Sequence, residues 1–200
     1  MEEGLFYVWK RIGPVIRNRV TSAFSVRSAR ERVERGKQQG GVMESPPMHP
    51  VLESSVSFLL GTWRGEGEGG FPTIQSFKYG EEIKLWHVGK PMMAYAQRTW
   101  KAASGEPMHA ESGYFRPKPD GSIEVVIAQS TGLAEVQKGT YDFEKKTLEL
   151  RSSLVGNASK VVEITRRFTV EGDVLKYSVD MATHTQDLQP HLHAVLKKVS

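Results

Sequence analysis

The chain has 200 residues, of which 38% are hydrophobic and 25% charged, and its formal net charge is +4. This composition is typical of a folded globular protein, and no run approaches the roughly 20 apolar residues of a membrane-spanning helix. There is no cysteine, which excludes disulfides, thiolate metal sites, a cysteine nucleophile and thiolate-ligated haem.

The positive charge is concentrated at the N-terminus. Residues 1–45 contain nine basic and five acidic residues, so this segment accounts for the whole net charge of +4. The rest of the chain has equal numbers of basic and acidic residues. It therefore lacks the basic excess of a nucleic-acid-binding domain, and we expect no nucleic-acid partner. Within the segment, apolar residues recur at near-helical spacing around Pro14: Leu5, Val8, Trp9, Ile12, Val15 and Ile16.

Such a basic amphipathic stretch is typical of a helix on a membrane surface or of an organelle-targeting peptide, and a poorly ordered tail is the alternative. Glu2 and Glu3 argue against a clean transit peptide, which is poor in acidic residues. The adjoining "GKQQGGVMESPPMHP" has the composition of a linker. We therefore predict a basic tail and linker over 1–47 and a folded domain over 48–200. We expect a cytoplasmic protein and leave organelle targeting by the tail open.

The folded part reads as a short helical segment and then a series of strands. Residues 51–60 have a helix-like pattern, whereas the residues beyond 60 show period-2 alternation, as in Ile123, Val125 and Ile127. Turn signals such as "PDGS" and "EGD" separate the alternating runs. We predict ten strands, over about 61–69, 75–88, 92–101, 107–117, 122–129, 132–142, 147–155, 161–170, 173–184 and 191–199.

Ten consecutive strands without helices between them favour an all-β fold, a ten-stranded antiparallel up-and-down β-barrel. An open meander would leave two exposed edges, and closure removes them. Side chains alone no longer fill a barrel of more than about eight strands, so we expect an internal cavity that holds a small ligand.

The glycine-rich "GTWRGEGEGGFPTI" does not form a nucleotide-binding loop, because no strand precedes it and no helix comes after it as that fingerprint requires. Glycines in a barrel strand allow a sharp bend or close approach of a ligand to the backbone. No metalloprotease-type His motif or nucleophile elbow is present. Glu81 and Glu82 are adjacent, so in a strand they face opposite ways and cannot act as an acid–base pair. The residues alone therefore indicate a ligand-holding β-barrel.

Several segments together resemble the nitrobindin family: "GTWRGEGEG", "FPTIQSFKYGEEI", "PMHAESGYFRPKPDG", "AQSTGLAEV", "NASK" and "QPHLHAVL". The resemblance runs from about His49 to the C-terminus. It implies a ten-stranded barrel with haem b at one end, and His191 as the ligand of the iron. It also implies that Thr73 contacts the haem and that further residues line the cavity, namely Phe77, Met108, His109, Gln129 and Met181.

The position of His191 conflicts with simple alternation. His191 and His193 would share one strand face, opposite Leu192 and Ala194, so neither would face a core that the leucine faces. We therefore predict an irregularity near Pro190 that turns His191 toward the barrel mouth, with His193 exposed or hydrogen-bonded. The second nitrogen of His191 should meet a carbonyl, carboxylate or water.

The resemblance implies a protein that binds nitric oxide and isomerises peroxynitrite to nitrate at ferric haem. We expect apolar residues on the open side of the iron and no catalytic side chain beyond the iron ligand. His109 is either a polar modulator or an inert wall residue. Two other functions stay open, a haem-free carrier of lipophilic ligands and a nitric-oxide sensor without turnover. Membrane contact through the tail and a homodimer are also left open.

Overall fold

The computed structural model describes residues 44–200, which form one compact unit. The amphipathic helix expected in the N-terminal tail lies outside the described residues. Within 44–200, no helix is long and apolar enough to cross a membrane.

Two short helical turns precede the strands. The helix α2 spans Pro50–Glu53, and the 3-10 turn η1 spans Ser57–Leu59. Pro50 suits the first turn of a helix because its missing N–H would have no partner there, and the Nδ1 atom of His49 accepts a hydrogen bond from the Val51 amide at 3.2 Å. The helical segment expected over 51–60 is thus present, but as two separate turns.

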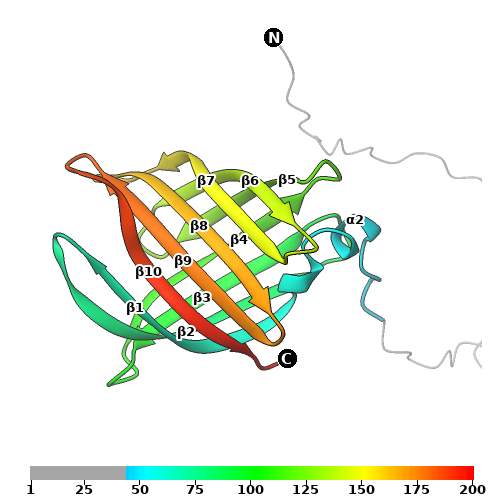
Figure 1. Cartoon of the computed structure of the whole chain (residues 1–200), viewed down its shortest axis with the longest axis horizontal. Helices are drawn as coiled ribbons and strands as arrows, with labels where there is room; N and C mark the ends of the chain where they lie inside the picture. Colours follow the sequence, from blue (N-terminus) through cyan, green and yellow to red (C-terminus); the bar gives the residue numbers. More distant parts are fainter. Residues whose placement is uncertain (1–43) are drawn as a thin grey trace, which may run out of the picture. The chain divides into compact units, whose positions relative to one another are not determined.

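Ten antiparallel strands complete the chain (Figure 1). They are β1 Gly61–Phe71, β2 Ile74–His87, β3 Met93–Lys101, β4 Pro107–Pro117, β5 Ser122–Gln129, β6 Ala134–Asp142, β7 Thr147–Gly156, β8 Val161–Glu171, β9 Val174–Thr183 and β10 Gln186–Lys198. The predicted boundaries agree with these to within two residues except at the last strand, which begins at Gln186 instead of 191.

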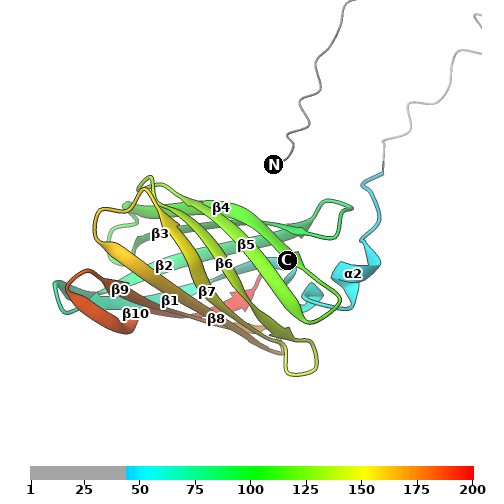
Figure 2. The ribbon, with the colours of Figure 1, turned by 90° about the horizontal axis from the view of Figure 1, so that it is seen from above.

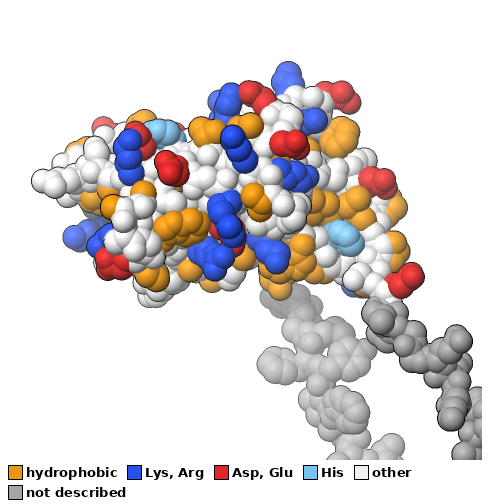
Figure 3. All heavy atoms as spheres, turned by 90° about the horizontal axis from the view of Figure 1, so that it is seen from below, with side chains coloured by type: hydrophobic (Ala, Val, Ile, Leu, Met, Phe, Trp, Pro, Cys, Tyr) orange, Lys and Arg blue, Asp and Glu red, His pale blue; other side chains and the backbone are white. Residues whose placement is uncertain are grey.

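The sheet is a closed barrel. Each strand pairs with its neighbours in the chain, and β10 pairs with β1 from Trp63↔Lys198 to Gly69↔Leu192. Figure 2 shows the same ring of strands from above. The prediction of a ten-stranded up-and-down barrel is confirmed. On the face of the barrel that Figure 3 shows, charged side chains of both signs are interspersed with apolar ones.

One end of the barrel is filled by apolar side chains. Leu52 and Leu59 of the helical turns are fully buried, and so is Trp63 at the start of β1. The Trp63 indole donates a hydrogen bond from Nε1 to the Leu59 carbonyl oxygen at 2.8 Å, which fixes the turn against the strand. This end lies beside α2, and the β1–β2, β5–β6 and β9–β10 turns lie at the other end (Figure 1).

The glycines of β1 make room for aromatic rings on β2. Gly67 pairs with Tyr79 and Gly69 with Phe77. A Cβ atom at Gly67 would collide with the Tyr79 ring, and one at Gly69 with the Phe77 ring and Leu192. The glycine-rich stretch is therefore a barrel strand, as its lack of nucleotide-loop context indicated. At Gly67 and Gly69, the groups that come close to the β1 backbone are side chains of the protein itself.

Candidate functional site

A pocket of about 330 Å³ opens at the barrel end opposite α2. Its volume lies at the lower end of the range of about 300–1,000 Å³ typical of small-molecule sites. The structure brings together six of the seven predicted site residues on its wall: Phe77, Met108, His109, Gln129, Met181 and His191. Thr73 does not line the pocket. It is exposed in the turn between β1 and β2.

His191 reaches the pocket through a β-bulge. On β9, Asp180 pairs with Pro190 and Val179 with Leu192, so His191 is the extra residue of β10. A bulge bends the strand and breaks the strict alternation of side chains. His191 accordingly lines the pocket, whereas the His193 side chain is 67% exposed on the outside. The predicted irregularity near Pro190 is confirmed.

The imidazole of His191 is held by two neighbours. Its Nδ1 atom lies 3.0 Å from the carbonyl oxygen of Gly70. A carbonyl can only accept, so we assign the proton to Nδ1, which leaves the lone pair of Nε2 for a ligand. The ring of Phe71 packs against the imidazole nearly perpendicular to it, with ring centres 5.8 Å apart. The Gly70 carbonyl is thus the kind of partner that was expected for the second nitrogen of His191.

A second bulge explains why two consecutive residues line the pocket. Thr99 of β3 pairs with His109, and Trp100 pairs with Pro107, so Met108 is the extra residue of β4. In a regular strand, Met108 and His109 would face opposite sides of the sheet. Both therefore contribute to the pocket, although Met108 stays 41% exposed.

The pocket floor carries charges that sequence reasoning missed. Arg166 of β8 and Glu111 of β4 line the pocket, and Glu135 of β6 contacts Arg166 without lining it. All three side chains are buried, with exposed fractions of 6% or less. The guanidinium of Arg166 contacts Oε1 of Glu111 and Oε1 of Glu135, each at 2.6 Å. The pocket is otherwise mostly apolar, and Arg166 and Glu111 are among the few charged side chains on its wall. A usable signal existed, because Arg166 is in phase with the inward-facing Ile164 and Phe168.

The buried carboxyl groups have pKa values shifted in opposite directions. Burial alone would raise the pKa of Glu111, but the charge of Arg166 and hydrogen bonds from His109, Arg166 and Tyr95 outweigh it and hold the pKa at about 2. For Glu81, burial and repulsion by Glu111 raise the pKa to about 8. Glu111 is therefore ionised and Glu81 mostly protonated at neutral pH.

The adjacent Glu82 lies on the other face of β2, as alternation predicts. It pairs on the outside with Arg64 and Arg98, whereas Glu81 has no exposed surface. His109 links the pocket wall to the floor, because its Nε2 atom lies 3.3 Å from Oε2 of Glu111.

Comparison with known proteins identifies the family. Residues 54–198 match the family described as "THAP4-like, heme-binding beta-barrel domain". The chain belongs to this family, the nitrobindin family. Among curated relatives, an Arabidopsis thaliana protein named "Peroxynitrite isomerase Rv2717c" is 64% identical over 156 residues, which cover 78% of this chain and 93% of the relative.

Relatives in mycobacteria are more distant. A protein of Mycolicibacterium paratuberculosis named "Peroxynitrite isomerase 1" is 45% identical, over 76% of this chain and 96% of the relative. The crystal structure of Rv2717c from M. tuberculosis superposes with a TM-score of 0.70 at 38% identity, over 77% of this chain and 100% of that one. The predictions of family and fold are confirmed.

The residues of the pocket fit a haem. Within 44–200, no group of three or more His, Cys, Asp or Glu side chains is arranged to hold a bare metal ion. Porphyrin supplies most of the ligands of haem iron, so a single imidazole from the protein suffices. His191 offers one imidazole nitrogen, and Phe77, Met181 and Leu192 offer apolar walls for a flat ring system.

Proposed function

We propose that this chain is a haem b protein that isomerises peroxynitrite to nitrate and binds nitric oxide at the same iron. The observation that carries the proposal is the bulge at His191, whose imidazole lines the pocket with Nδ1 directed at the Gly70 carbonyl oxygen. The names of the relatives support the reaction, because the Arabidopsis protein at 64% identity is called a peroxynitrite isomerase.

The reaction requires little of the protein itself. Peroxynitrite and nitrate contain the same atoms, so the O–O bond breaks and a new N–O bond forms without net oxidation or proton transfer. Ferric haem, when bound, supplies the iron at which this rearrangement takes place. No side chain of the chain needs to act as a general acid or base.

The residues of the chain would bind the haem and orient its histidine ligand. His191 would hold the iron through Nε2, while Gly70 and Phe71 keep its ring in one orientation. Phe77, Met181 and Leu192 would exclude water from the faces of the porphyrin. We assign His109 no proton-transfer step, since its Nε2 is directed at the carboxylate of Glu111.

The test is the yield of nitrate from peroxynitrite added to the haem-loaded protein. We expect the decay of peroxynitrite to accelerate in proportion to the protein concentration, with nitrate as the product at the expense of nitrite. A protein that binds nitric oxide but leaves the decay rate at the buffer value would be a sensor without turnover. A purified chain that shows no Soret band after haem addition would instead match the lipophilic-carrier alternative.

A further inference from the structure

Arg166 has no hydrogen-bond donor left for a ligand. A guanidinium carries five N–H bonds. Nε donates to Glu135 at 3.2 Å, Nη1 donates to Glu111 at 2.6 Å and to the Tyr177 hydroxyl at 2.6 Å, and Nη2 donates to Glu111 at 3.0 Å and to Glu135 at 2.6 Å. All five donors therefore end on acceptors of the protein, on a side chain that lines the pocket.

The surroundings of Arg166 contain more carboxyl groups than cations, although of these carboxyl groups only Glu111 lines the pocket. Two carboxylates, Glu111 and Glu135, face the single guanidinium of Arg166. Glu81 adds a third buried carboxyl group, and its Oε2 atom has no hydrogen-bond partner among residues 44–200. The amide of Gln129 donates to Glu135, so this donor is also used within the protein.

Buried arginines are well suited to binding carboxylates, because their donors match both oxygens in one plane. An apolar barrel with one free arginine at its floor would thus accept an amphiphile whose carboxylate enters first. Here Glu111 and Glu135 occupy the sites that such a head group would use. A ligand anion at the floor would gain no hydrogen bond from Arg166 and would face uncompensated negative charge.

We infer that Glu111 and Glu135 are specificity-determining residues of the pocket, which exclude ligands with a buried anionic head by saturating Arg166. The pocket thereby rejects fatty-acid-like carboxylates and remains available to ligands whose buried part is uncharged. This inference rests on the pocket itself and holds whether or not the chain isomerises peroxynitrite.

The experiment compares decanoate with 1-decanol, which share a chain length and differ in the charge of the head group. Binding is measured by calorimetry on the full-length chain without added haem, after circular dichroism has confirmed its folding. We expect the wild type to bind decanoate at least about tenfold more weakly than decanol. The double variant Glu111→Gln/Glu135→Gln should gain decanoate affinity by about tenfold or more, the effect of one hydrogen bond to a charged group. Its affinity for decanol should stay unchanged.

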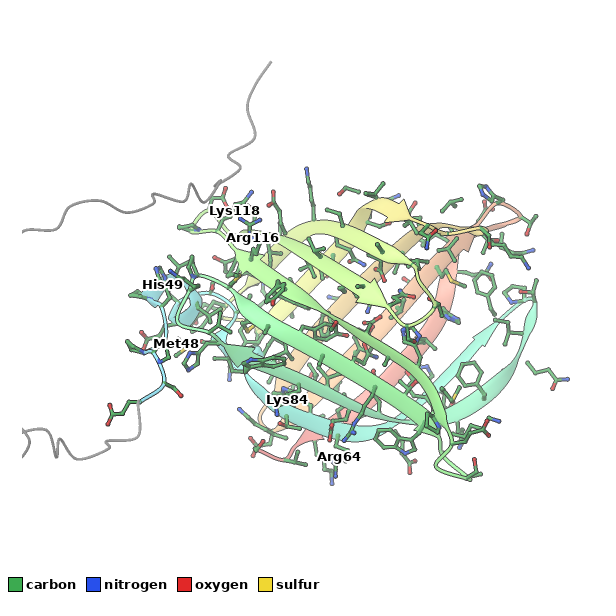
Figure 4. All side chains as sticks on the ribbon, turned by 180° about the vertical axis from the view of Figure 1, so that it is seen from behind. Met48, His49, Arg64, Lys84, Arg116 and Lys118 are labelled. Atoms are coloured by element: carbon green, nitrogen blue, oxygen red, sulfur yellow. The ribbon has the colours of Figure 1, made fainter. Side chains whose placement is uncertain are left out.

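Three further variants make the result specific. The single variant Glu135→Gln keeps the Glu111–Arg166 pair and replaces the double variant if that protein does not fold. It should show a smaller gain in decanoate affinity. Adding Arg166→Gln to the double variant should abolish the gain. Glu82→Gln is the matched control, because this carboxylate pairs with Arg64 on the outside of the barrel, where Arg64 is 54% exposed (Figure 4).

Two outcomes would overturn the inference. One is a wild type that binds decanoate as tightly as decanol, and the other is a set of floor variants without any gain of decanoate affinity.

A haem titration separates this result from the proposed function. Decanoate should displace haem, seen as loss of the Soret band, from the double variant and not from the wild type. A protein that binds no haem but still shows the gain would contradict only the proposed function.

Discussion

The Nδ1 atom of His191 lies 3.0 Å from the carbonyl oxygen of Gly70, across the β1–β10 seam that closes the barrel. The same closure that joins the first and last strands thus fixes the tautomer of the residue proposed to bind iron. Phe71, the residue after Gly70, holds the ring plane from the side.

The first prediction concerns Phe71. Phe71→Ala removes the ring that packs against the imidazole, so His191 gains rotational freedom while its hydrogen bond to the backbone can persist. We expect haem to dissociate about tenfold faster, the lower end of the effect of losing a side chain that orients a metal ligand. Transfer of haem to excess apomyoglobin measures this rate. Phe143→Ala, an exposed phenylalanine in the β6–β7 turn, should leave the rate unchanged.

The second prediction concerns the glycines of β1. Gly69→Ala places a methyl group against the Phe77 ring and Leu192, both on the pocket wall, so the wall must shift. We expect a loss of about 1–3 kcal/mol in the free energy of unfolding, as for other overpacked sites, together with weaker haem binding. Gly70→Ala is the matched neighbour, because the nearest atom to its Cβ is Oγ of Ser76 at 3.3 Å. Equal unfolding midpoints in urea for the two variants would contradict this account.

The third prediction is a pH dependence set by Glu81. Its pKa is raised to about 8 in the folded state, against an ordinary value of 4.5. Between these two values the folded chain holds a proton that the unfolded chain has lost, so stability should fall as the pH rises from about 4.5 to 8.

Glu81→Gln mimics the protonated carboxyl at every pH and should remove this decline. From pH 5 to pH 8, the free energy of unfolding of the wild type should fall by several kcal/mol more than that of the variant, since one unit of pKa shift corresponds to about 1.4 kcal/mol. Urea unfolding at pH 5, 6.5 and 8 measures it. If the free energy of unfolding changes with pH in the same way for the wild type and the variant, then Glu81 titrates normally.

The strands of the barrel were predictable from sequence because period-2 alternation is a local property. Ile123, Val125 and Ile127, which alternate in the sequence, are all buried on β5. The helical segment was less well predicted, because the chain turns twice within ten residues to cover the barrel end and so breaks a continuous helix.

The site was only partly predictable, for a physical reason. A bulge depends on the register between two strands, which no single strand contains. Alternation alone would have turned His191 away from the pocket, and only the family resemblance favoured it over His193. The charged floor was missed because Glu111, Glu135 and Arg166 come from three strands far apart in sequence, so that alternation indicates an inward-facing Arg166 but not its partners.

The most direct test of the central claim is a haem titration of three proteins, monitored by the Soret band: the wild type, His191→Ala and His193→Ala. We predict saturable one-to-one binding for the wild type and for His193→Ala, since that side chain points outward, and a loss of about a hundredfold or more in affinity for His191→Ala. Nitric oxide should shift the Soret band only in the two proteins that bind haem. If His191→Ala binds haem as tightly as the wild type, then His191 does not hold the iron and the account is wrong.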